Sequence, residues 1–186
     1  MFRVQAEAEV DKCAWLCEYY AEHAEAYRRR ALTLLQGVYE EGLPDGATLE
    51  GLARARWAGG DFGRAGALAR QALDAAEPPE EGRALALFVV ADCAIRERDF
   101  GEAVARLEEL TRLRRFVEDW RLLGLCYLEQ NQPVRALRAL ERALAMRPFR
   151  PDLHAALAAC YLRLGDAQSA REHQEKAKWL AEHSQQ

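Results

Sequence analysis

Apolar residues recur at helical spacing along most of this chain, and short polar turns interrupt them at regular intervals. Three such turns lie at 60–62 (Gly-Asp-Phe), 98–100 (Arg-Asp-Phe) and 165–167 (Gly-Asp-Ala). An alanine follows each turn three residues on, and Ala136 falls in phase with these alanines after a fourth turn at 131–133 (Asn-Gln-Pro). Because the alanines at 65, 103, 136 and 170 are separated by 38, 33 and 34 residues, the pattern predicts a stack of repeated helix pairs.

The chemistry of each turn fits the junction between two antiparallel helices. The first helix of a pair ends at a glycine or a polar residue, where the chain turns. The aspartate that follows can accept hydrogen bonds from the free N–H groups of the second helix. Pro133 fits the first turn of such a helix because its N–H is not needed there. The alanine then lies where the two helices cross closely and only a small side chain fits.

The segment 117–150 resembles a nearly ideal tetratricopeptide repeat, because eight residues stand at the spacing of that family's signature: Trp120, Leu123, Gly124, Tyr127, Ala136, Leu140, Ala143 and Pro148. Weaker units are predicted at about 46–79, 84–117 and 151–184, and the last of these carries His154 in the tryptophan place. The resemblance implies an all-α fold, a tetratricopeptide-type α-solenoid of antiparallel helix pairs wound into a right-handed superhelix.

Two segments fall outside the regular repeat. Residues 1–45 have repeat-like elements and aromatic residues, so they form either a cap for the stack or a partner interface. We expect two helices there, breaking near residues 22–27, and Thr48 as the N-cap of the helix that follows. The insertion at 77–82 (Glu-Pro-Pro-Glu-Glu-Gly) predicts a longer loop between the first two units of the repeat domain, 46–186.

Composition narrows the classes of function. The 186 residues carry a formal net charge of −4, which gives no electrostatic reason to expect binding to nucleic acid or to an anionic membrane. The first residues lack the apolar core of a secretory signal, and no apolar run is long enough to span a bilayer. We therefore expect a bacterial cytoplasmic protein. Arginine clusters at 28–30 and 112–115 are interpreted as solvated faces that pair with nearby glutamates.

Cysteine and histidine positions favour packing over chemistry. Cys93, Cys126 and Cys160 recur at the same place of successive units, where a small buried side chain is needed. Cys13 and Cys17 share a helical face near His23, but the sequence supplies no further ligands of a zinc motif. No nucleophile motif and no phosphate-binding glycine loop is visible. We expect no enzyme activity, no cofactor and no metal.

In the tetratricopeptide family the first helices of the units line a concave groove. Carried over place by place, the resemblance implies a partner-binding groove made of Arg54, Trp57, Leu85, Phe88, Asp92, Ile95, Arg121, Leu125, Leu128, Ala159 and Leu162. This wall is mainly apolar and lacks the Lys and Asn pattern by which some members hold a C-terminal carboxylate. It therefore suits a protein or peptide segment with hydrophobic anchor residues.

The leading hypothesis is a scaffold or chaperone that binds such a segment. A helical extension before a few repeats is similar in architecture to the class II chaperones of type III secretion, which gives a more specific alternative. A second alternative is a structural subunit that assembles, for example as a homodimer, through its N-terminal aromatic residues, since the C-terminal helix is polar apart from Trp179 and Leu180.

Overall fold

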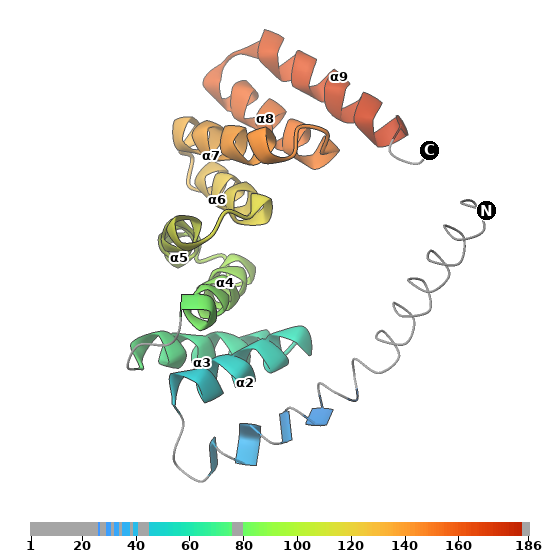
Figure 1. The fold of residues 1–186 in the computed structure, drawn as a ribbon. Coiled ribbons are helices and arrows are strands. Elements are labelled where there is room, and N and C mark those ends of the chain that lie inside the picture. Colours follow the sequence, from blue (N-terminus) through green and yellow to red (C-terminus); the bar gives the residue numbers. More distant parts are fainter. Residues whose placement is uncertain are drawn as a thin grey trace, which may run out of the picture.

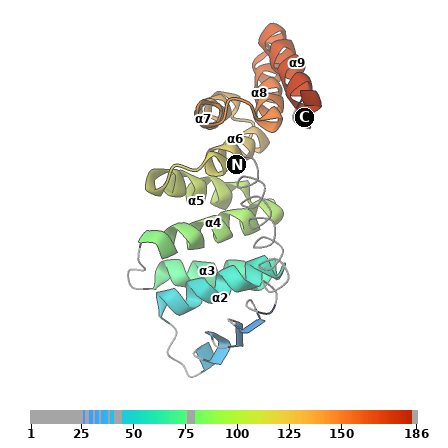
Figure 2. The ribbon, with the colours of Figure 1, turned by 45° about the vertical axis from the view of Figure 1, so that its right-hand side comes forward.

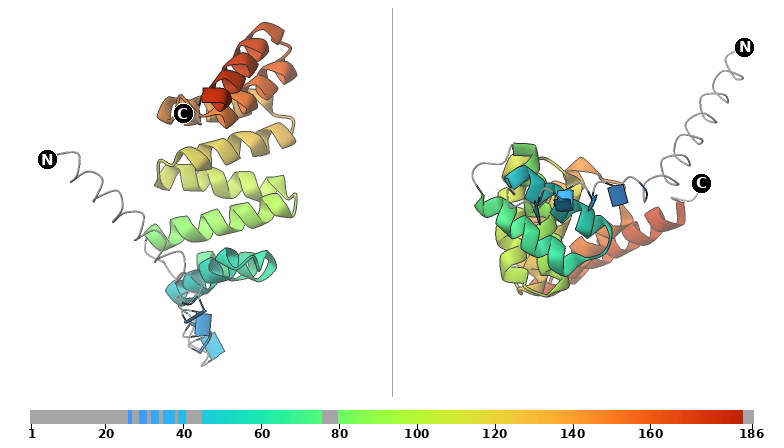
Figure 3. Two further views of the ribbon diagram at one scale, coloured as in Figure 1. Left: turned by 90° about the vertical axis from the view of Figure 1, so that its right-hand side faces the viewer. Right: turned by 90° about the horizontal axis from the view of Figure 1, so that it is seen from below.

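The computed structural model describes residues 45–75 and 80–183 continuously and, before them, residues 26, 29, 30, 32, 33, 35–37, 39 and 40. The described part holds eight bounded helices and no strand: α2 (Gly46–Ala58), α3 (Phe62–Asp74), α4 (Glu80–Arg96), α5 (Phe100–Leu113), α6 (Val117–Glu129), α7 (Pro133–Met146), α8 (Pro151–Leu164) and α9 (Ala167–His183). Consecutive helices pair antiparallel and stack into a column (Figures 2 and 3). This confirms the predicted all-α solenoid.

The turn inside each helix pair uses the same backbone device. The residue two positions before each second helix is left-handed, with φ between 56° and 81°: Gly60, Arg98, Asn131 and Gly165. In three of the four turns an aspartate follows and its carboxylate accepts a hydrogen bond from a backbone N–H of the new helix. The left-handed residue reverses the chain and the aspartate caps the next helix, as the sequence predicts.

Two helix starts differ from the sequence prediction. Asp45, not Thr48, is the N-cap of α2, because its carboxylate accepts the backbone N–H of Thr48 at 2.7 Å. Helix α4 begins at Glu80, inside the predicted loop 77–82. The sequence is compatible with this start, because Glu80 and Glu81 stand in the first turn, where acidic residues interact favourably with the helix dipole.

The core runs along the inside of the column, between neighbouring helices. One buried cluster joins α2, α3 and α4, and a second extends from α4 to α8. The phased alanines 65, 103, 136 and 170 are fully buried where the helices of a pair cross. The helices approach so closely at Gly124 that a Cβ there would lie 2.6 Å from Cγ of Leu140.

The column curves, and its two ends lean towards the same side (Figure 1). On the inside of the curve α2 contacts α4, and α6 contacts α8. In the described part, the second helices α3, α5, α7 and α9 make no comparable contact with one another. This difference in spacing bends the column, so α2, α4, α6 and α8 form its concave wall.

Candidate functional site

An aromatic and acidic cluster occupies the first half of the concave wall. The indole Nε1 of Trp57 on α2 donates a hydrogen bond of 2.7 Å to Oδ2 of Asp92 on α4. The ring of Trp57 also meets the ring of Phe88 edge to face, with centroids 5.4 Å apart. Arg96 donates to the same carboxylate oxygen at 2.8 Å. These contacts bring three predicted groove residues together and hold the two helices in a fixed orientation.

A recess opens in the middle of the wall, where α4 and α6 are less closely packed. It measures about 360 Å³, and its lining includes the predicted residues Ile95 and Leu125 together with Leu122 and Phe100. Arg98 and Glu129, which form an ion pair at 4.0 Å, also line it. The recess therefore has an apolar lining beside one charged pair.

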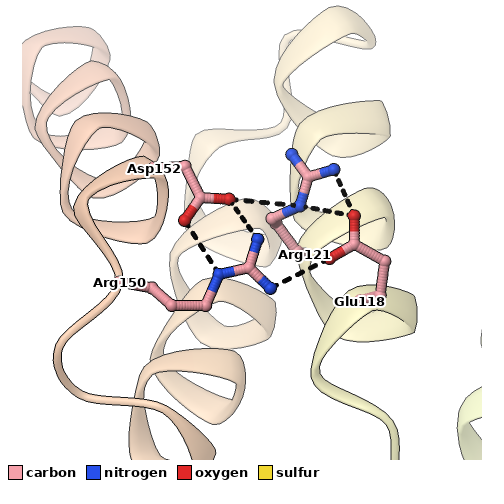
Figure 4. A network of polar contacts seen from close by, with 4 residues as sticks. All are labelled: Glu118, Arg121, Arg150 and Asp152. Carbon is pink, nitrogen blue, oxygen red and sulfur yellow. Dashed lines mark hydrogen bonds and ion pairs between the residues drawn. The ribbon is translucent and has the colours of Figure 1, made fainter. Parts of the chain in front are cut away.

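A network of four charged residues joins α6 to α8 at the far half of the wall (Figure 4). Arg121 donates to Glu118 and lies 3.6 Å from Asp152, while Arg150 donates to both carboxylates at 2.9–3.1 Å. The guanidinium groups lower the pKa of Glu118 through hydrogen bonds from Arg121 first and Arg150 second. Alternating charges of this kind hold their side chains in place.

The other predicted groove residues differ in exposure. Arg54 is exposed on α2, Leu85 and Ala159 are half-buried, and Leu162 is 55% exposed on α8. The prediction that Leu128 lines the groove is wrong. Its side chain is buried in the core and offers almost no surface, because it lies on the face of α6 that packs inward. The wall therefore exposes less apolar surface than predicted, since most of its apolar side chains are half-buried.

Comparison with known proteins agrees with this geometry. Residues 127–175 match the family model described as tetratricopeptide repeat. This matched segment carries tetratricopeptide repeats. No curated protein matches it by sequence.

Solved structures similar to this tetratricopeptide protein include several called MamA. A MamA of AMB-1 has a TM-score of 0.75 and 23% identity, with coverage of 89% of this chain and 90% of that one. A MamA of MSR-1 has a TM-score of 0.74 and 21% identity over 92% and 97% of the two chains. MamA from Desulfovibrio magneticus RS-1 has a TM-score of 0.73 and 20% identity over 92% and 96%. At these identities the likeness shows the fold.

The recurring cysteines are buried packing residues, as the sequence predicts. Burial raises the pKa of the Cys126 thiol to about 12 and is the main reason that the pKa values of Cys93 and Cys160 rise to about 11. A thiol with such a pKa is almost entirely protonated at neutral pH and is a poor nucleophile.

His154, which is buried, and His173, which is half-buried, form a pair between α8 and α9. The carbonyl of Pro148 can only accept, so His154 donates to it from Nε2 at 3.0 Å. Its Nδ1 then accepts from Nδ1–H of His173 at 2.9 Å. Burial, followed by the proximity of His154, lowers the pKa of His173. The pair therefore fixes the tautomers of both rings and fills the tryptophan place of the last repeat.

Several residues that the sequence analysis considered as metal ligands or interface residues lie outside the described part of the chain. Cys13, Cys17 and His23 lie outside the described residues, as do Trp15, Tyr19, Tyr20 and Tyr27 of the N-terminal aromatic set. Within the described ranges no group of three His, Cys, Asp or Glu side chains is arranged to hold a metal ion. No helix in that same part of the chain is long and apolar enough to cross a membrane.

Sequence reasoning missed Arg150 and Asp152 as wall residues. A signal for them was present, because Glu118 and Asp152 stand 34 residues apart in the same place of successive repeats. Arginines close to both acids in sequence, at 121 and 150, could then be expected to bridge them across the interface between repeats.

Proposed function

We propose that this tetratricopeptide protein is a non-catalytic scaffold whose concave wall binds a segment of another protein. The observation that carries the proposal is the apolar recess between α4 and α6, because it lies in the wall at the point where neighbouring first helices separate. Ile95 and Leu125, both predicted from the repeat register, contribute to its lining. A hydrophobic anchor side chain of a partner would remove this lining from water.

The polar groups around the recess favour a defined binding mode. Trp57, Asp92 and Arg96 are bonded to one another on one side, and the Arg121–Glu118 pair lies on α6, the helix that supplies Leu125. Because these side chains are already held in place, binding does not require the full cost of ordering them. We propose an extended or helical partner segment with one or two apolar anchors, positioned by these fixed charges.

Two substitutions test the wall with little risk to the fold. Leu162→Glu changes an exposed residue of α8, and Leu125→Ala reduces the lining of the recess. Val134→Glu is the matched control, since Val134 is 54% exposed on α7, a second helix. Each tagged variant is incubated with a lysate of the source organism, and captured proteins are identified and quantified.

We expect one or more partners captured by the native protein to be reduced at least fivefold by Leu162→Glu and by Leu125→Ala, and to be retained by Val134→Glu. A partner set that is unchanged by both wall variants would exclude the concave wall as the binding surface. Circular dichroism of each variant separates loss of binding from loss of fold.

The more specific roles stay hypotheses. A chaperone of the class II type of type III secretion would keep its captured partner soluble, which co-expression with that partner tests. Self-assembly through the N-terminal aromatic residues is tested by light scattering over a range of concentrations. A monomer mass at every concentration would rule out self-assembly, including the homodimer.

A further inference from the structure

A second cleft lies on the side of the column opposite the concave wall. Its sides are α5 and α7 and its floor is α6, and in Figure 1 α5 lies on the outer side of the curve. Two adjoining hollows of about 570 and 630 Å³ make up this outer cleft, and they share Thr111, Arg112, Trp120 and Arg142. Helix α6 contributes to both surfaces, but none of the groove residues described above lines the outer cleft.

The outer cleft has an excess of positive charge, although the whole chain is negative. Arg112, Arg138 and Arg142 line it, and none forms an ion pair within 4.0 Å in the described part of the chain. Glu108 is the one carboxylate among its described lining residues, and it already accepts hydrogen bonds from Arg135 and from the hydroxyl of Tyr127. The three arginines therefore remain uncompensated and attract an anion.

Trp120 on the floor provides a second, independent sign of a ligand. Its indole Nε1 is buried and has no hydrogen-bond partner among the described residues. The guanidinium of Arg142 lies over its ring, 5.0 Å from the centroid. A buried donor without a partner is costly, and a ligand acceptor would relieve that cost if the side chains that cover Nε1 moved aside on binding. This cation–π contact holds the Arg142 guanidinium beside the cleft, where a guanidinium can bind a carboxylate.

The dimensions of the outer cleft suit a stretch of chain better than a single ion. Its lining on α7 runs from Arg135 to Met146, which at 1.5 Å per residue is about 16 Å. An extended peptide of about five residues has the same length. Leu113 and Met146, 43% and 37% exposed, add apolar surface at one end. A segment that carries both carboxylates and apolar side chains would match the arginines and the apolar surface at the same time.

We propose that the outer cleft binds an extended acidic segment of a partner protein. Its carboxylates bind Arg112, Arg138 and Arg142, one acceptor reaches Nε1 of Trp120, and an apolar side chain packs at the Leu113 end. The protein would thus hold two partners, or two parts of one partner, on opposite faces.

The test uses a fluorescently labelled peptide in which glutamate alternates with leucine, titrated with the full chain and followed by anisotropy. Matched probes are the same peptide with lysine for glutamate and a labelled oligothymidine. The variants are Arg112→Glu with Arg142→Glu, and Trp120→Phe, which removes the N–H and keeps a ring. Arg171→Glu with Lys178→Glu, both exposed on α9, gives the charge-matched control.

We expect the acidic peptide to bind at least tenfold more tightly than the basic one. The double reversal in the cleft should weaken binding at least tenfold, Trp120→Phe about fivefold, and the α9 control less than twofold. Leu162→Glu, in the concave wall, should leave this affinity unchanged, so the two proposals can fail separately.

Three results would overturn the proposal. One is equal binding of the acidic and basic peptides, and another is an affinity that the cleft reversal does not change. The third is tighter binding of oligothymidine with the same dependence on Arg112 and Arg142, which would assign the cleft to nucleic acid. If the double reversal does not fold by circular dichroism, Arg138→Glu alone is measured against the same expectation, with at least a threefold loss.

Discussion

Gly124→Ala tests the close crossing of α6 and α7, which sets the geometry of the best-formed repeat. A Cβ at this position would lie 2.6 Å from Cγ and 2.8 Å from Cδ2 of Leu140, and 3.3 Å from the carbonyl oxygen of Ala136. Leu140 is fully buried, so it cannot move aside into solvent. Inserting one methyl group into a well-packed core typically costs about 1–3 kcal/mol.

The substitution also has a favourable effect, since alanine is better than glycine in a helix interior by about 1 kcal/mol. Taking about 2 kcal/mol for the overpacking, the net loss of unfolding free energy is about 1 kcal/mol. For a chain of this size, that lowers the melting temperature by about 2–4 °C. Urea and thermal unfolding followed by circular dichroism measure both quantities.

Two further variants test whether steric contact with Leu140 causes the loss of stability. Leu140→Ala removes the side chain that the new methyl group would meet, so in that background Gly124→Ala should stabilise the protein by about 1 kcal/mol. Gly63→Ala is the control, because a Cβ at Gly63 on α3 meets nothing within 4 Å, and it should be neutral or stabilising. If Gly124→Ala has the same effect with and without Leu140, steric contact is not what determines this glycine.

Three other predictions follow from local chemistry. Arg98→Gly should raise the unfolding free energy by about 1 kcal/mol, since Arg98 is left-handed at φ 62° and glycine adopts that region without strain; a loss in urea unfolding would contradict this. Burial keeps the Cys126 thiol protonated, so iodoacetamide at pH 8 should modify it only after unfolding, as mass spectrometry would detect. The pKa of His173 is lowered by folding, so its contribution to stability is complete above the unfolded value of about 6.5 and is lost as the pH falls. The melting temperature should therefore drop between pH 7 and 5. The drop should be smaller in His173→Asn. An equal drop in the two proteins would show that the packing of His173 against His154 does not cause this pH dependence.

The sequence predicts the helix boundaries where the determining chemistry is local. Asp61 and Asp99 cap α3 and α5, and each needs only the N–H groups three residues further on. The start of α4 at Glu80 was missed, because the repeat register placed the unit at 84 while the proline pair and two glutamates allow an earlier turn of helix. The helix there starts earlier than the repeat register predicts.

Which arginines form ion pairs could not be predicted from the sequence in the same way. The cluster at 112–115 was expected to pair with nearby glutamates, yet only Arg114 does pair, and its partner is the buried Asp119 on the next helix. Arg112 and Arg115 form no ion pair within the described part of the chain. Arg114 and Arg115 follow the last residue of α5, so their pairing depends on the path of the connection to α6, and charge patterning along the sequence does not contain that information.

Arginine occurs on both proposed surfaces, the concave wall and the outer cleft, but its charge is compensated differently on each. Arg121 and Arg150 on the concave side lie between neighbouring repeats, where Glu118 and Asp152 compensate their charge, so we expect them to attract anions only weakly. Arg142 on α7 contacts the ring of Trp120 and forms no ion pair within the described part of the chain, whereas Arg135 on the same helix pairs with Glu108 of α5. The charge of an arginine is therefore compensated only where an acidic side chain of a neighbouring helix lies within reach, as Glu108 does for Arg135. Because the two sets share no partner, charge changes on one face should have additive effects with changes on the other.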